Sequence, residues 1–176
     1  ALVDFKESGK FIMAYGEYVS QKSYYLASVA DNIYVNPEGI VEMRGIGAEL
    51  TFFKKMLDKL DADVEVFKVG TFKSAIEPFI REDISEPNRE QLEFLLGGIK
   101  EDFINHISKD RNIDRNDLET YINQLAFSSV DTSVTLGLID ASKYYDEVQD
   151  ELMEIVGVEK STAEKSINKP LSSSSL

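Results

Sequence analysis

The sequence predicts an α/β fold with a largely parallel sheet, flanking helices and a helical C-terminal half. In the first 80 residues, short apolar runs typical of buried strands alternate with segments of helical spacing. Beyond Pro78 the character changes, and the remaining apolar residues recur at helical spacing. With 43% hydrophobic residues in a chain of 176, there are enough apolar side chains for one well-buried core.

The first elements alternate between helix and strand. The chain lacks an initiator Met and opens inside an amphipathic helix, so we expect a piece of a longer protein. Residues 11–15 form a short apolar run after a helix C-cap and predict a buried strand. Ser20 can cap a helix that continues to about residue 30. Residues 32–37 predict a second strand, stopped by the Pro-Glu-Gly that begins at Pro37.

The next 30 residues continue the alternation. Residues 40–47 predict a short strand and a glycine-rich turn, in which Gly45 and Gly47 fit a simple tight turn. Residues 48–60 have helical spacing. Residues 63–69 alternate with period two before a glycine, which predicts another strand.

The C-terminal half is predicted to be helical. Residues 88–111 form one long helix that contains Gly97 and Gly98, and since the pair costs roughly 2 kcal/mol relative to alanines, we expect close packing there. Shorter helices are predicted at 117–125, 131–137 and 142–156. We expect one domain over residues 1–165 and a Ser-rich linker or disordered tail over residues 166–176.

The composition excludes several kinds of site. A formal charge of −13 with no clustered cations disfavours nucleic acid and anionic lipid partners. Cysteine is absent, which removes thiol nucleophiles and thiolate metal sites. The single histidine, His106, lies at the edge of a helical apolar stripe, where we expect a structural role. We therefore expect no metal and no cofactor, and any chemistry must use Ser, Thr, Lys, Tyr, Asp or Glu.

One lysine has the surroundings of a catalytic base. Lys73 follows the predicted strand 63–69 amid Phe72, Ala75 and Ile76, and open α/β sheets place their sites at the carboxyl ends of strands. A free lysine has a pKa of about 10.4 and is protonated at pH 7. Lowering that pKa to 7 costs roughly 4.6 kcal/mol, which full burial among apolar groups can supply. From pattern alone, a solvated surface charge remains the alternative interpretation.

Two stretches carry a resemblance to a known family. Residues 67–81, FKVGTFKSAIEPFIR, resemble the lysine motif of the signal peptide peptidase A (protease IV) family. Residues 23–28, SYYLAS, and 30–39, ADNIYVNPEG, resemble the helix and strand that follow its nucleophile. With the LDKL segment at 57–60, the likeness covers most of residues 3 to 145. It places Gly45 and Gly47 near where family members shape the substrate cleft, and the simple tight turn remains the alternative. It implies a ClpP/crotonase-like fold and a Ser/Lys dyad in which Lys73 is the general base, as in the N-terminal domain of the two-domain bacterial form.

The sequence departs from this family at the nucleophile. Where the family has Ser-Gly-Gly before paired aromatic residues, this chain has Gln21-Lys22-Ser23 before Tyr24. A glutamine amide cannot act as the nucleophile. Ser20 is better explained as a helix N-cap and Ser23 as a first-turn residue. The family's first strands and its oxyanion loop precede the region matched by the start of this chain, so no oxyanion site can be located.

The resemblance therefore implies that a second, homologous domain outside this chain supplies the serine to Lys73, and that the isolated chain is inactive. It also implies a homo-oligomer, a tetramer in the family, that degrades cleaved signal peptides at the bacterial cell membrane, on the periplasmic side, with the membrane anchor outside this chain. The alternative is a non-catalytic domain that assembles the oligomer. Acyl-CoA chemistry on the related crotonase fold is disfavoured because the chain has no cationic patch for nucleotide phosphates.

Overall fold

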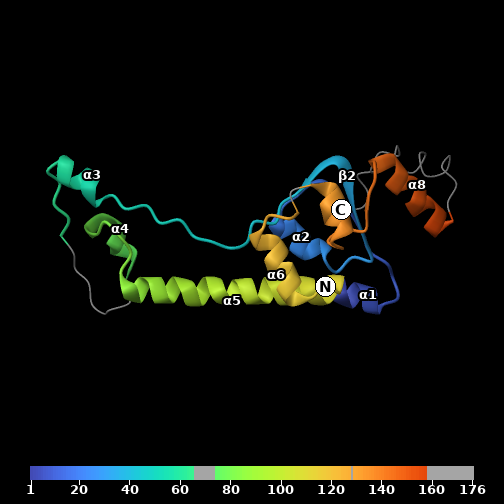
Figure 1. Ribbon diagram of the computed structural model, residues 1–176, viewed down its shortest axis with the longest axis horizontal. Coiled ribbons are helices and arrows are strands. Elements are labelled where there is room, and N and C mark those ends of the chain that lie inside the picture. Colours follow the sequence, from blue (N-terminus) through green and yellow to red (C-terminus); the bar gives the residue numbers. More distant parts are fainter. Residues whose placement is uncertain (66–73, 128, 158–176) are drawn as a thin grey trace, which may run out of the picture. The chain divides into compact units, whose positions relative to one another are not determined.

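The computed structural model describes residues 1–65, 74–127 and 129–157. These residues divide into two compact units (Figure 1). The first unit consists of Ala1–Arg44 together with the chain from His106 onward, and the second is Gly45–Asn105. The second unit is therefore an insertion within the sequence of the first.

The first unit contains a three-stranded parallel sheet with the strand order β1-β2-β3. Its strands are β1 (Met13–Val19), β2 (Asn32–Val41) and β3 (Ala141–Ser142). Its helices are α1 (Leu2–Glu7), α2 (Gln21–Ala27), α6 (Arg115–Asn123), α7 (Val130–Thr135) and α8 (Tyr145–Val156). The predicted α/β class, with a parallel sheet and flanking helices, is confirmed.

The core of the first unit lies between the sheet and its helices. Tyr24 of α2 and Val35 of β2 are completely buried, as are Leu118 of α6 and Leu138 beside β3. The Tyr24 hydroxyl donates a hydrogen bond to the Leu138 carbonyl oxygen across 114 positions of sequence. The carboxylate of Asp140 accepts a hydrogen bond from the Ile33 N–H at 2.7 Å. These bonds hold the segment that leads into β3 against α2 and β2, although β3 is only two residues long.

The second unit is mostly helical in its described residues. It contains α3 (Lys54–Lys59), the 3₁₀ turn η1 (Ser74–Ile76), α4 (Glu77–Ile80) and most of α5 (Glu86–Arg111), the long continuous helix in Figure 1. The predicted helix over 88–111 is confirmed. Among the described helices, no segment is long and apolar enough to span a bilayer.

Several sequence predictions need correction. Pro37 does not stop the second strand, because the register of β2 against β1 shifts between Gly16↔Val35 and Tyr18↔Ile40, and this irregularity accommodates a residue that has no N–H to donate. The predicted helix over 48–60 is confirmed only for Lys54–Lys59. Leu50 and Phe52 precede that helix without regular structure and line a pocket of about 260 Å³ with side chains of α5, so an irregular segment uses these apolar residues.

The predicted packing at Gly97 and Gly98 is wrong. A Cβ atom added at either residue would meet nothing within 4 Å in the described structure. The predicted strand over 63–69 is not formed in its described part, residues 63–65, and its other residues lie outside the described ranges. The tail over 166–176 also lies outside them, so the single domain over 1–165 and its tail stay predictions.

Candidate functional site

Lys73, the predicted general base, lies outside the described residues, together with the predicted turn at Gly70 and Thr71. The description resumes at Ser74, the first residue of η1. The geometry that bears on Lys73 is therefore that of the segment which directly follows it in the sequence. That segment is η1 and α4, which together cover seven residues.

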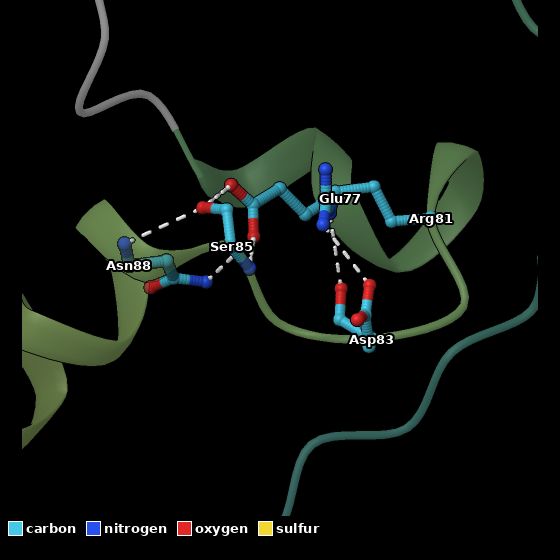
Figure 2. A network of polar contacts seen from close by, with 5 residues as sticks. All are labelled: Glu77, Arg81, Asp83, Ser85 and Asn88. Carbon is cyan, nitrogen blue, oxygen red and sulfur yellow. Dashed lines mark hydrogen bonds and ion pairs between the residues drawn. The ribbon is translucent and has the colours of Figure 1, made fainter.

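Glu77, the first residue of α4, is buried, with 3% of its surface exposed. Figure 2 shows its carboxylate among polar side chains from the start of α5. It accepts hydrogen bonds from the Ser85 N–H and from the Asn88 side-chain amide, each at 3.1 Å, and from the Ser85 hydroxyl. Every one of these partners donates, so the pocket around Glu77 suits an ionised carboxylate.

The pKa of Glu77 follows from these contacts. Burial raises the pKa of this carboxyl, but the hydrogen bonds from Ser85 and Asn88 and the charge of Arg81 outweigh burial and hold the pKa below its ordinary value. The guanidinium of Arg81 is itself paired with Asp83 at 3.0 Å (Figure 2). Glu77 is thus a buried anion at neutral pH, held by donors from α5.

A second set of contacts holds α4 to the start of α3. The Phe53 N–H donates to the Pro78 carbonyl oxygen at 2.6 Å. The rings of Phe53 and Phe79 stack with centroids 5.8 Å apart and planes at 23°. The segment after Lys73 is therefore held both by the residue before α3 and by the first turn of α5.

Gln21, at the position of the family's nucleophile, begins α2. Its side-chain carbonyl oxygen accepts a hydrogen bond from the Arg44 N–H at 3.0 Å, so this amide serves a structural contact. Ser20 caps α2 as predicted, accepting from the Ser23 N–H at 3.2 Å. The hydroxyls of Ser20 and Ser23 are 2.6 Å apart and bond each other. Neither serine is given a base by the contacts described around it.

A small pocket of about 250 Å³ lies at the end of β2 in the first unit. It is lined by Ile40, Val41, Glu42, Met43, Arg44, Leu125 and Phe127. Its volume is smaller than the roughly 300–1,000 Å³ of ordinary ligand sites, and it suits one side chain of a larger ligand. Gly45, which follows the lining residue Arg44 in the sequence, has φ +84. This conformation favours glycine and fits the tight-turn interpretation.

His106 belongs to the C-terminal part of α5, which is in the first unit, and its side chain is exposed. Its ring makes an edge-on contact with Tyr25 of α2, with centroids 5.4 Å apart. This contact fits the predicted structural role. Sequence reasoning missed Glu77, which lies inside the lysine motif but received no role there. The only signal was a carboxylate eight residues before a Ser-x-x-Asn helix start, which does not by itself indicate that the two groups meet.

The chain is similar in sequence to several curated proteases. It is 43% identical over 113 residues to "Protease 4" of Haemophilus influenzae and 42% identical over 113 residues to "Protease 4" of Salmonella typhi, in each case 64% of this chain and 18% of the relative. It is 32% identical over 159 residues to "Serine protease SPPA, chloroplastic" of Arabidopsis thaliana, 90% of this chain and 23% of the relative. The chain thus spans about a fifth of the length of these curated relatives. Because the model of peptidase family S49 matches residues 4–159, most of its length, the chain belongs to peptidase family S49.

Proposed function

We propose that this chain contributes the general-base lysine, Lys73, to the Ser/Lys dyad of a longer serine endopeptidase that degrades cleaved signal peptides. The observation that carries the proposal is the family match over residues 4–159, which includes both the Lys73 motif and Gln21. The relatives named Protease 4 and Serine protease SPPA support a serine peptidase. Since Gln21 cannot be the nucleophile, a second homologous domain outside this chain supplies the serine.

The chemistry assigned to Lys73 is proton transfer. The neutral amine takes the proton of the serine hydroxyl as the oxygen attacks the scissile carbonyl carbon, and the resulting ammonium then protonates the departing amine. Water hydrolyses the acyl-enzyme in a second step, again with Lys73 as base. The amine must be shielded from water to be neutral near pH 7.

We further propose that the complete protein forms a homo-oligomer, by family resemblance a tetramer, and acts at the bacterial cell membrane on its periplasmic side. The alternative, a domain that only assembles the oligomer, is favoured by one observation. The middle of α5 presents large apolar side chains to solvent, with Phe94 86%, Leu95 57% and Ile99 48% exposed. An assembly domain needs such a surface but places no demand on the protonation of Lys73.

The test is made in the full-length protein, with an unstructured peptide whose cleavage is followed by mass spectrometry. Lys73→Ala should abolish turnover and leave folding and oligomeric state unchanged, because the interaction is made chiefly in the transition state. Lys73→Arg should fail as well, since a guanidinium stays protonated at any working pH. Near-normal activity of the arginine variant would contradict the proposal and leave the assembly role.

The isolated chain provides a matched control. It should not cleave the same peptide, since Gln21 occupies the nucleophile position. Cleavage by the isolated chain that Ser20→Ala or Ser23→Ala abolished would overturn the division of the dyad between two domains.

A further inference from the structure

The pocket at the end of β2 is lined largely by consecutive residues, from Ile40 to Arg44. In this segment Val41 and Met43 are buried, whereas Ile40 and Arg44 are exposed. Such alternation is typical of extended backbone, in which side chains one position apart point to opposite faces. Arg44 therefore extends toward solvent from a pocket whose other lining residues are apolar, apart from Glu42.

Another lining residue, Leu125, has a strained backbone conformation. It ends α6 in a Schellman motif, in which the Ala126 N–H donates to the Tyr121 carbonyl oxygen at 2.9 Å and the Leu125 N–H donates to that of Ile122 at 3.0 Å. Its φ is +53, and glycine is the usual residue at this position because a side chain disfavours the left-handed conformation. Leu125 is also 56% exposed, so packing in the core does not offset the strain. A ligand in the pocket would give this side chain a use.

The two charged residues of the pocket leave hydrogen-bond donors for a ligand. Glu42 accepts the Tyr18 hydroxyl on Oε2 and the Arg44 Nε on Oε1, the latter at 3.1 Å, so each carboxylate oxygen already has a donor. The Arg44 side chain is 78% exposed, and the contacts of the described residues include no bond to its terminal nitrogens, Nη1 and Nη2. A guanidinium presents its nitrogens as a fork that matches the two oxygens of a carboxylate.

From these observations we propose that the pocket binds the C-terminal residue of a peptide, with its apolar side chain against Leu125 and Phe127 and its carboxylate on the Arg44 guanidinium. The pocket volume of about 250 Å³ suits one side chain. The ligand class rests on the proposed function, because an endopeptidase leaves a free carboxylate at each new C-terminus. Gln21, in the place of the nucleophile, accepts a hydrogen bond from the Arg44 N–H, so the pocket lies beside a position that cannot cut the peptide.

The test uses the full-length protein carrying Lys73→Ala, so that peptides are bound and not cut. The probe is a short alanine peptide that ends in photo-leucine, a leucine analogue that cross-links to neighbouring side chains on irradiation. It is made with a free and with an amidated C-terminus. Mass spectrometry locates the cross-links, and labelling against probe concentration gives the affinity of the labelled site. We expect the free-acid probe to label Met43, Leu125 or Phe127, and amidation to weaken its binding about tenfold.

Two variants separate binding from stability. Leu125→Gly removes an apolar wall but relieves the positive φ, so it should weaken binding about five- to tenfold while the melting temperature changes by no more than about 2 °C. Arg44→Gln removes the fork from an exposed side chain and should weaken binding of the free-acid probe about tenfold, leaving the amidated probe unaffected. Asn112→Gly is the matched control, because Asn112 is exposed and has φ +53 but does not line the pocket. It should bind both probes as the parent protein does.

Cross-links outside the pocket, or equal affinity for the two probes, would overturn the inference. A Leu125→Gly protein that binds as tightly as its parent would overturn it as well. So would one that melts far below its parent, because Leu125 would then serve stability. The proposed function is tested separately, since peptide cleavage by the Lys73→Ala protein would contradict it, whereas the positions of the cross-links would still decide whether the pocket binds a peptide end.

Discussion

Each of the two units of this chain is stabilised internally by a different kind of contact. The first unit buries apolar side chains from strands and helices, including completely buried Val35, Leu118 and Leu138. In the described part of the second unit, the buried apolar side chains are Phe103 and Ile104 at its C-terminal end, and the contacts among its other residues include the polar attachment of Glu77 and the stacking of Phe53 on Phe79. The first unit therefore has a larger apolar core, whereas most apolar side chains described in the second are at least partly exposed.

This difference bears on where function resides. Precise positioning does not require a large core, because a few charge-assisted hydrogen bonds can fix a short segment. A surface rich in exposed apolar side chains is free to meet a partner. The second unit combines both properties in its described residues, as the proposed dyad shared between two domains would require.

The largest effect that would test this comparison comes from truncating one apolar side chain in each unit. Leu138→Ala, in the first unit, should lower the free energy of unfolding by about 2–5 kcal/mol, because it leaves a cavity. Phe94→Ala, whose ring is 86% exposed in the second unit, should change it by no more than about 0.5 kcal/mol. Urea unfolding followed by circular dichroism measures both. A large cost at Phe94 would mean that its ring is covered in solution, and the contrast between the units would fail.

Replacing a glycine by alanine should change the free energy of unfolding in opposite directions in the two units. A Cβ at Gly39 in β2 would lie 2.5 Å from the Glu17 carbonyl oxygen, so Gly39→Ala should destabilise the protein by about 1–3 kcal/mol. Gly98 is inside α5 with nothing within 4 Å of an added Cβ, so Gly98→Ala should stabilise it by about 0.8–1 kcal/mol. Melting temperatures of the two variants give the comparison. A destabilising Gly98→Ala would reveal a close neighbour at that face of the helix.

The smallest effect is a pH dependence confined to the first unit. Burial raises the pKa of the Tyr24 phenol well above its ordinary value of 10.0, so the folded state keeps the proton while the unfolded chain loses it. The stability contributed by Tyr24 is fully present below pH 10 and is lost as pH rises through the folded pKa. The slope of stability against pH above 10 should therefore be less steep in Tyr24→Phe. All eight tyrosines lie outside residues 45–105, so amide exchange there should not follow this slope.

Much of the fold could be predicted because local signals agreed with the tertiary structure. Ser20 caps α2, and the helical spacing of residues 88–111 gives α5. The same spacing misled at residues 48–53, because periodicity shows which side chains share a face but not whether a helix or an irregular segment carries them. Membership of family S49 agrees with the ClpP/crotonase-like fold that the resemblance implied.

The candidate site was predictable only in part. The lysine motif and the substitution of Gln21 for a serine are visible in the sequence, since each is a matter of residue identity. The role of Glu77 is not visible, because it depends on a bond to Ser85, eight positions later, across a change of element. A reactive side chain can be recognised in the sequence from its residue type, whereas a side chain that holds a segment through hydrogen bonds can be recognised only from the structure.

The short strand β3 has a consequence for how the chain matures during synthesis. β3 pairs with β2 through Tyr34↔Ala141 and Val35↔Ser142, so the edge of β2 remains open until more than a hundred further residues have left the ribosome. During that interval all residues of the second unit, Gly45–Asn105, have been synthesised, while the first unit still lacks β3. An open strand edge can pair with any extended strand nearby, so the nascent chain carries an aggregation hazard until β3 is made.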